Sequence, residues 1–206
     1  MKTIRTLIVD DHAILRMGLS SLLASKKDIE VVGTAASGEA AIRKVVHCKP
    51  DVVIMDLLMP GMNGCEATRR ILAASPDTKV LILTTYGTAN ILSSALEAGA
   101  SGAILKSSDY TDLIASIRTV ANGGRVVSPE IEQLLVSDPP LPELSKRQKE
   151  ILEYITQGLT DHEIAWQLGI GLPMVKEHVN TLRQKLGAAN RAEAVAIALR
   201  KHLLKI

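Results

Sequence analysis

The fold is decided by residues 51–64, which read Asp51-Val52-Val53-Ile54-Met55-Asp56-Leu57-Leu58-Met59-Pro60-Gly61-Met62-Asn63-Gly64. The apolar run at residues 52–55 predicts a buried strand, and Pro60-Gly61 predicts a turn shortly after it. Asp56 therefore stands at the carboxyl end of the strand. Because open α/β sheets bind ligands beyond the carboxyl ends of their strands, we take Asp56 as the candidate reactive residue.

The same succession of a short apolar run and an amphipathic helix occurs five times before residue 125. It predicts a five-stranded, doubly wound parallel sheet, since right-handed crossovers place helices on both of its faces. The predicted strands are residues 6–9, 29–34, 52–55, 80–83 and 103–105. The predicted helices are residues 14–23, 39–47, 64–74, 89–98 and 109–121.

The composition is that of a globular protein with two modules. The chain has 206 residues, of which 47% are hydrophobic, 22% charged and only 2% aromatic, so its cores are built from aliphatic side chains. The apolar runs are shorter than the roughly 18 residues of a membrane span, and no secretory signal opens the sequence. We expect a cytoplasmic location. Cys48 and Cys65 lack the spacing of a disulfide framework or a zinc site.

Charge and proline mark the boundary between the modules. Residues 1–138 carry 14 Lys and Arg against 15 Asp and Glu, whereas residues 139–206 carry 10 against 7, a modest basic bias. Ser128-Pro129 predicts the start of a short helix, and Pro139, Pro140 and Pro142 predict an extended tether. We expect one domain at residues 1–125, a linker with a short helix at 126–142, and a second domain at 143–206.

Polar side chains follow four of the predicted strands. Asp10 and Asp11 follow the first, Asp56 the third, Thr84 the fourth and Lys106 the fifth, so they converge on one edge of the sheet. Clustered carboxylates suit Mg²⁺, and a carboxylate can act as the nucleophile that accepts a phosphoryl group. Lys106 and the Thr84 hydroxyl can neutralise and hydrogen-bond the phosphoryl oxygens. The pattern predicts a phosphoryl-transfer site.

Asp10-Asp11, residues 56–61, Thr84 and the stretch 99–106 together resemble the receiver domain of two-component response regulators, which has a flavodoxin-like fold. The resemblance implies a phosphoacceptor role for Asp56 and contacts of Thr84 and Lys106 with the phosphoryl group. It implies Mg²⁺ ligation by Asp11, by Asp10 through water, by Asp56, and by the Leu58 carbonyl. One position departs: Ala103 stands where receivers often carry an aromatic switch residue, so activation must use another element.

Other interpretations of the acidic edge remain open. A phosphatase of the haloacid-dehalogenase type also uses a strand-end aspartate, but Leu58 occupies its second aspartate position. No glycine-rich loop typical of nucleotide binding is present. His12 reads as a polar residue that opens the first helix. Leu58 and Tyr86 would shield the site from water, which predicts a long-lived phosphoryl group on Asp56.

The chain after residue 139 predicts an all-α, four-helix unit. Three N-cap residues, each with Glu or Gln three positions later, predict helix starts at Ser145, Thr160 and Asn190. A fourth helix begins near Leu172-Pro173, after a glycine-containing turn, so the second and third helices form a helix-turn-helix candidate.

The third of these helices has one apolar and one polar face. Val175, Val179, Leu182 and Leu186 fall together and predict an inward face. The polar side can hold DNA phosphates and reach base edges, although a solvated polar face is the ordinary alternative. Its DNA-binding candidates are Lys176, Glu177, Asn180, Thr181, Arg183, Gln184 and Lys185.

Residues 144–148, 158–165 and 175–187 resemble the LuxR/NarL-type DNA-binding domain. The resemblance places Lys176, Glu177 and Asn180 toward the DNA groove, with Arg183 and Lys185 near phosphates. Gln148 and Met174 stand where the family more often has Glu and Thr. The resemblance also implies dimerisation through the last helix, with packing inside the domain as the alternative for Ala194, Val195, Ala198 and Leu199.

Together these features predict a transcription regulator of the NarL/LuxR class of response regulators. A sensor histidine kinase would phosphorylate Asp56, and the phosphoryl group would control homodimerisation and binding to double-stranded DNA. The receiver would catalyse only its own phosphorylation and dephosphorylation. The alternative is a phosphate-independent DNA-binding regulator whose receiver switch has degenerated, as Ala103 indicates.

Overall fold

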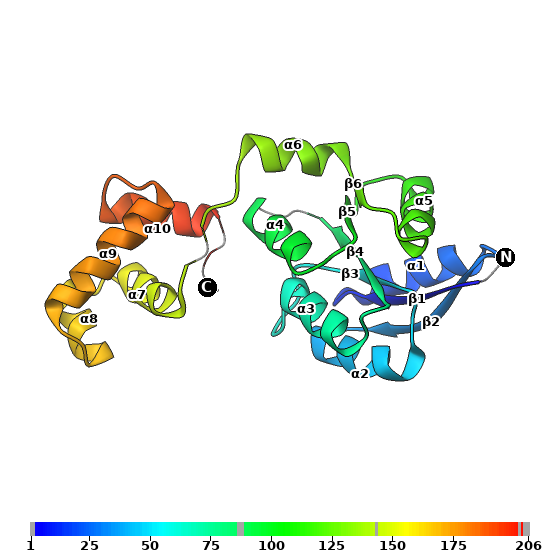
Figure 1. Cartoon of the computed structure of the whole chain (residues 1–206), viewed down its shortest axis with the longest axis horizontal. Coiled ribbons are helices and arrows are strands. Elements are labelled where there is room, and N and C mark those ends of the chain that lie inside the picture. Colours follow the sequence, from blue (N-terminus) through cyan, green and yellow to red (C-terminus); the bar gives the residue numbers. More distant parts are fainter. Residues whose placement is uncertain (1–2, 86–88, 143, 202, 204–206) are drawn as a thin grey trace. The chain divides into compact units, whose positions relative to one another are not determined.

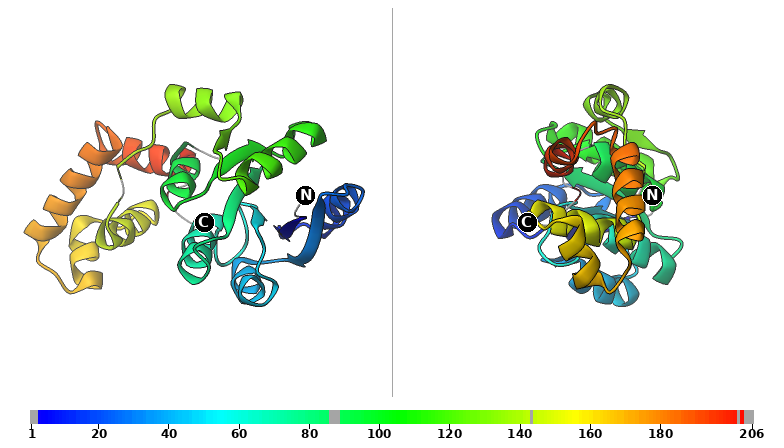
Figure 2. Two further views of the ribbon diagram at one scale, coloured as in Figure 1. Left: turned by 45° about the vertical axis from the view of Figure 1, so that its right-hand side comes forward. Right: turned by 90° about the vertical axis from the view of Figure 1, so that its left-hand side faces the viewer.

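The computed structural model describes residues 3–85, 89–142, 144–201 and 203. The chain divides into two compact units, Met1–Pro139 and Pro140–Ile206. We call the first the sheet unit and the second the helical unit; their elements are labelled in Figure 1 and seen from two further sides in Figure 2.

The sheet unit is built on a parallel sheet in the order β2-β1-β3-β4-β5-β6. The predicted parallel, doubly wound architecture is confirmed. The sheet has one strand more than the five predicted, because β6 is a pair of half-buried valines too short to produce a strand pattern. The strands are β1 Ile4–Val9, β2 Ile29–Ala35, β3 Val52–Met55, β4 Lys79–Thr84, β5 Gly102–Leu105 and β6 Val126–Val127.

Helices cover both faces of this sheet (Figures 1 and 2). Alternate strand residues point into two separate apolar clusters, one beneath α2, α3, α4 and α6 and one beneath α1 and α5. All four residues of β3 are buried, which explains the continuous apolar run that marks this strand in the sequence. The helices are α1 Ala13–Ala24, α2 Gly38–Cys48, α3 Gly64–Ala74, α4 Ala89–Glu97, α5 Tyr110–Ala121 and α6 Pro129–Ser137.

The predicted short helix of the linker exists as α6, with Ser128 as its N-cap and Pro129 in its first turn. It does not lie in a free tether, because Ile131 is buried in the apolar cluster that also contains residues of α4 and β5. β6 and α6 thus extend the sheet unit beyond residue 125. We propose that the linker proper is the proline-rich stretch 138–142.

The helical unit consists of α7 Lys146–Thr156, α8 Asp161–Leu168, α9 Leu172–Leu186 and α10 Arg191–Arg200. Reciprocal capping boxes open α7, from Ser145 and Gln148, and α8, from Thr160 and Glu163. The third predicted box is incomplete: Asn190 accepts a hydrogen bond from the Glu193 amide, but the Glu193 carboxylate accepts from Ala189 N–H instead.

The core of the helical unit contains the predicted inward face of α9. Val175, Val179, Leu182 and Leu186 are all buried in one cluster with residues of α7, α8 and α10. α8 and α9 pack on each other as the two helices of the predicted helix-turn-helix. The turn between them begins at Gly169, which ends α8 in the left-handed conformation.

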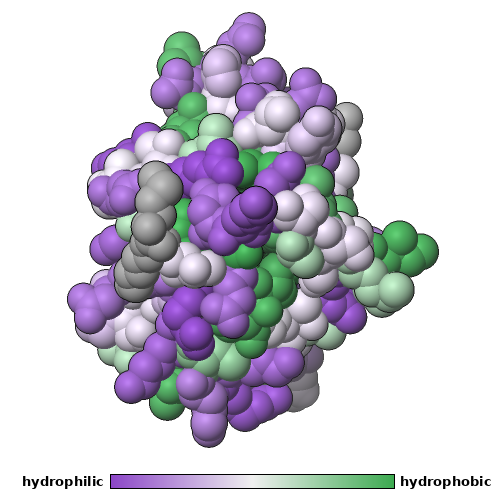
Figure 3. All heavy atoms as spheres, turned by 90° about the vertical axis from the view of Figure 1, so that its right-hand side faces the viewer, coloured by the Kyte–Doolittle hydropathy of each residue, from purple (hydrophilic) through white to green (hydrophobic). Residues whose placement is uncertain are grey.

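The surface carries isolated apolar side chains. Figure 3 shows one face of the molecule, on which hydrophobic residues reach the surface between hydrophilic ones. The most exposed large apolar side chains include Ile14 and Met17 of α1 and Trp166 of α8. Scattered exposure of this kind is ordinary for a globular protein. In the described part of the chain, every helix is too short or too polar to cross a bilayer.

Candidate functional site

The strand-end residues of the sheet unit meet at one buried edge. Lys106 Nζ lies 2.6 Å from Asp10 Oδ2 and 2.8 Å from Asp56 Oδ2. Asp10 and Asp56 are 2% and 3% exposed, respectively. The structure therefore brings together three of the predicted residues from three different strand ends, with two carboxylates sharing one ammonium group.

The two buried carboxylates carry more negative charge than the single Lys106 ammonium can neutralise. Burial raises the pKa of the Asp56 carboxyl above its ordinary value, against the opposing effect of the hydrogen bond from Lys106. Burial also disfavours the charged form of Lys106, but its hydrogen bonds to Asp10 and Asp56 leave the pKa of the ammonium raised. The charged Asp56 carboxylate is thus held at a cost in free energy, which additional positive charge at this edge would offset.

The donor set fits a hard divalent cation. Asp10, Asp11, Asp56 and His12 each offer an atom within 4.8 Å of the others. Asp11 Oδ1 is buried and accepts no hydrogen bond from the described residues, although His12 Nδ1 lies 2.9 Å away. A buried carboxylate oxygen without a hydrogen bond is unfavourable unless a cation binds it. Three carboxylates offer the oxygen ligands that Mg²⁺ prefers.

Leu58 contacts Asp56, and Thr84 contacts Lys106. Thr84 is fully buried at the end of β4, and its carbonyl accepts a 2.7 Å hydrogen bond from Lys106 N–H. Leu58 N–H donates a long hydrogen bond, 3.4 Å, to Asp56 Oδ1, and its side chain is half exposed. Leu58 is thereby placed beside the Asp56 carboxylate. Tyr86, the other predicted shielding residue, lies outside the described residues.

Several residues outside the predicted phosphoryl-transfer set hold this edge in place. Arg16 of α1 donates to the Asp10 carbonyl at 2.6 Å, and His12 N–H donates to Asp10 Oδ1 at 2.8 Å. His12 is the N-cap residue of α1, as predicted. Gly64 begins α3 directly against Asp56, since a Cβ at residue 64 would lie 2.2 Å from the Asp56 carbonyl oxygen. The Asp56-x₇-Gly64 spacing was the available sequence signal.

On α9, four of the predicted DNA-binding residues are exposed: Lys176, Glu177, Asn180 and Gln184. Thr181 is half-buried, and its hydroxyl donates to the Glu177 carbonyl at 3.0 Å. α9 is the longest helix of the described chain, with 15 residues, and its exposed side carries amide and charged groups of the kind that contact bases and phosphates.

Arg183 and Lys185 make contacts inside the helical unit. Arg183 donates to the Ala189 carbonyl beyond the end of α9. Lys185 Nζ donates to Gln148 Oε1 at 3.1 Å, and the same oxygen accepts from Ser145 N–H at 2.9 Å. Gln148 thus links α7 to α9. These two cations are less free to approach phosphates than the exposed Lys176.

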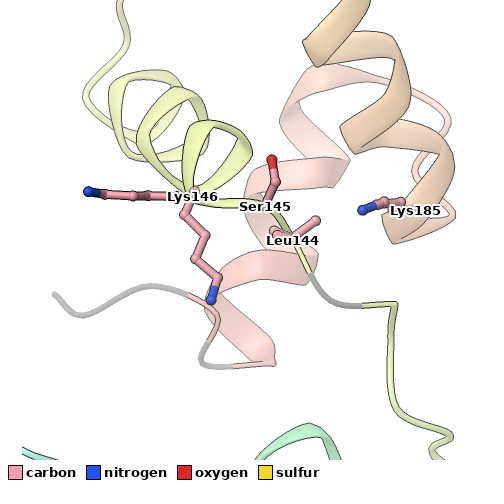
Figure 4. Close-up of a pocket in the computed structure, with 5 residues that line it drawn as sticks. Leu144, Ser145, Lys146 and Lys185 are labelled. Atoms are coloured by element: carbon pink, nitrogen blue, oxygen red, sulfur yellow. The ribbon is translucent and has the colours of Figure 1, made fainter.

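Sequence reasoning missed a basic pocket at the start of α7. Its volume is about 460 Å³, and it is lined by Leu144, Ser145, Lys146, Lys149 and Lys185. Figure 4 shows that the lysines come from two different helices, α7 and α9. The basic surface of the helical unit therefore extends beyond α9.

The predicted dimerisation residues fall into two groups. Ala194 and Ala198 are 1% and 0% exposed, because they pack in the core of their own unit. This burial agrees with the alternative of packing inside the domain for these two residues. Val195 is half-buried and Leu199 is 41% exposed, so only these two of the four offer surface.

Each of the two units matches the model of a known protein family. The model of the response regulator receiver domain matches residues 6–118, and the model of bacterial regulatory proteins of the luxR family matches residues 142–198. The chain belongs to the response regulators that join a receiver domain to a LuxR-type DNA-binding domain. This family consists of transcription regulators of two-component systems, which favours that interpretation over the phosphatase.

Individual relatives match over their full length. Oxygen regulatory protein NreC of Staphylococcus carnosus is 40% identical, over 97% of this chain and 99% of its own. Response regulator protein VraR of Staphylococcus aureus is 39% identical, over 98% and 100%. Among solved structures, the response regulator ChrA of a heme-sensing two-component system has a TM-score of 0.59 at 37% identity, covering 99% and 100%. The RcsB–DNA complex has 0.68 at 25%, covering 97% and 99%.

Proposed function

We propose that this protein accepts a phosphoryl group on Asp56 from a sensor histidine kinase and thereby controls its own binding to double-stranded DNA. The observation that carries the proposal is the buried edge at which Lys106 lies within 3 Å of both Asp10 and Asp56. A carboxylate held against one ammonium and a second carboxylate is suited to accept a phosphoryl group, whose charge the ammonium can balance.

Asp56 Oδ1 is the atom we assign as nucleophile, because Asp56 Oδ2 is held by Lys106. In the transfer, a bond forms between this oxygen and phosphorus while the bond from phosphorus to the histidine nitrogen of the kinase breaks. The imidazole leaves with the electron pair of that bond. Lys106 and the Thr84 hydroxyl would then hold the phosphoryl oxygens, and later attack by water would return the free carboxylate.

Mg²⁺ is the cation we assign to the acidic edge. Asp10, Asp11, Asp56 and the Leu58 carbonyl would hold it, with Asp10 acting through water. When bound, it would offset the negative charge of the carboxylates and of the incoming phosphoryl group. The buried Asp11 oxygen without a hydrogen bond supports this assignment.

In this proposal the helical unit binds DNA. Lys176, Glu177, Asn180, Thr181 and Gln184 of α9 would face the major groove, and Arg183, Lys185 and the basic pocket would lie near phosphates. Val195 and Leu199 would contribute to a homodimer formed on phosphorylation. The protein would act in the cytoplasm, and its only catalysis would be its own phosphorylation and dephosphorylation.

A second candidate function is supported by Ala103. This residue is fully buried where receivers often carry an aromatic switch side chain. A regulator that binds DNA without phosphate control would tolerate such a change. The acidic edge supports the phosphate-dependent proposal instead. Two buried carboxylates that share one lysine cost desolvation free energy, which a phosphoryl-transfer site would explain.

Phosphoryl incorporation tests the proposal. Full-length wild type treated with acetyl phosphate and Mg²⁺ is expected to gain the mass of one phosphoryl group, and Asp56→Ala is expected to gain none. Asp11→Asn should react about tenfold more slowly or worse, since it loses a metal ligand. Asp112→Asn, which changes an exposed carboxylate of α5, should react like wild type. Equal incorporation by wild type and Asp56→Ala would refute the assignment of Asp56.

A further inference from the structure

The helix α6 is docked on the sheet unit through one buried side chain. Ile131 is 1% exposed and belongs to the same apolar cluster as Leu92 and Ala95 of α4 and Ala103 of β5. Leu134 and Leu135 are half-buried against this cluster, and α6 contacts both α4 and β5 (Figure 1). The last element before the proline-rich linker is therefore part of the core of the sheet unit.

The start of α6 is tied to the strand that ends at Lys106. Val127 of β6 pairs with Ala103, and Ser128 N–H donates to the Ala103 carbonyl at 3.0 Å. Gly102 makes this pairing possible, because a Cβ at residue 102 would lie 2.3 Å from the Val126 carbonyl oxygen. Only two residues, Ile104 and Leu105, then separate Ala103, to which the start of α6 is tied, from Lys106, the lysine that contacts Asp56.

Ala103 is central to this docking. It is fully buried in the cluster that receives Ile131, and packed interiors have no spare volume for a larger group. An aromatic ring at residue 103 would need additional volume in the cluster that also receives Ile131. Ala103, which stands where receivers often carry an aromatic residue, thus lies in the cluster in which α6 is docked.

Docking of α6 also limits the reach of the linker. The proline-rich residues 138–142 span about 15 Å at roughly 3.1 Å per residue. Release of residues 128–137 would add up to about 33 Å. Helix-turn-helix dimers bind half-sites about 34 Å apart, which is one turn of DNA. Two helical units can therefore reach two half-sites more freely when α6 is undocked.

We propose that α6 is the output switch of the sheet unit: phosphorylation of Asp56 weakens the docking of Ile131 against α4 and β5, and the released linker lets the helical units engage DNA. This inference rests on the proposed function. The coupling is reciprocal, so loosening α6 without phosphate produces part of the active state.

Hydrogen exchange on full-length protein tests the coupling without any substitution in α6. Amides such as Glu132, which donates to Ser128 O, and Asp138, which donates to Leu134 O, report on this helix. Acetyl phosphate with Mg²⁺ should speed their exchange in wild type and leave Asp56→Ala unchanged. DNA affinity is measured in the same samples. Tighter DNA binding with unchanged α6 exchange would overturn the inference and leave the proposed function standing, whereas identical DNA binding by treated wild type and treated Asp56→Ala would overturn both.

A matched pair of variants tests the role of Ile131. Ile131→Ser should raise DNA affinity on the order of tenfold without a phosphodonor and reduce the further response to one. Val136→Ser makes a similar change on the same helix at a side chain that is 83% exposed, so it should behave like wild type. A folded Ile131→Ser protein with wild-type basal affinity and a full phosphodonor response would contradict the switch.

Discussion

Asp10 and Asp56 share one ammonium group, and this imbalance has a consequence for stability. Burial raises the pKa of Asp56, so its ionised form is less favourable in the folded protein than in the unfolded chain. The contribution of the Asp56 carboxyl to the free energy of unfolding is therefore fully present below its ordinary pKa of 3.8. It is lost as the pH rises through the pKa of Asp56 in the folded protein. At neutral pH the carboxylate destabilises the sheet unit.

Replacing Asp56 by Asn should stabilise the protein in the absence of divalent cations. The substitution leaves one carboxylate, Asp10, to pair with Lys106, so we expect a gain on the order of 1 kcal/mol at pH 7, roughly 2–4 °C in Tm. The gain should shrink toward zero as the pH is lowered to the ordinary pKa of Asp. Calorimetry in a chelating buffer measures it. Asp112→Asn is the control for an exposed carboxylate, and a lower Tm for Asp56→Asn at pH 7 would contradict the charge argument.

The single residues that sequence reasoning found are those that carry chemistry at strand ends. Asp10, Asp56 and Lys106 could be predicted to meet, because parallel strands bring their carboxyl ends to one edge. The burial of Ala194 and Ala198 could not be predicted, because alanine suits both a protein core and an interface between helices. The hydrogen bond of Arg183 depends on the loop after α9, and that of Lys185 depends on the packing of α7 against α9; residue spacing specifies neither.

Two exposed side chains of α9 are suited to different contacts with DNA. Lys176 is an exposed cation that can release counterions from DNA, whereas Asn180 is an exposed amide that can read a base edge. Loss of the two side chains should therefore affect binding differently.

Lys176→Ala should weaken binding about equally on all duplexes and reduce the salt slope by about 1, whereas Asn180→Ala should lose about 1–3 kcal/mol of discrimination between sequences. The measurement is fluorescence anisotropy at several salt concentrations, with a duplex enriched from a random pool and a scrambled one. Lys27→Ala, at an exposed lysine of the sheet unit, should change neither property. Equal loss of specificity in both α9 variants would show that this division is wrong.

The elements were predictable to different degrees. Strongly periodic helices and continuously apolar strands were found within a few residues, because burial on one or both faces dictates their pattern. β6 and the docking of α6 were not found. A strand of two residues has no measurable period, and a helix with a single fully buried side chain, Ile131, reads the same whether it is free or docked.

The two units have complementary tasks in the full chain. The acidic edge and its lysine belong to the sheet unit, and the basic excess belongs to the helical unit, where phosphate contacts give binding its strength. A phosphoryl group on Asp56 can change DNA affinity only if it favours one arrangement of the chain over another. Phosphate control therefore requires that the protein with a phosphoryl group on Asp56 and the protein without one differ in DNA affinity.

DNA affinity of wild type and Asp56→Ala, each with and without acetyl phosphate and Mg²⁺ at one fixed salt concentration, measures that difference directly. We expect only treated wild type to bind DNA more tightly, by about fivefold or more. Asp112→Asn should respond like wild type. Equal affinities of treated wild type and treated Asp56→Ala would contradict phosphate control and favour a regulator that binds DNA independently of Asp56.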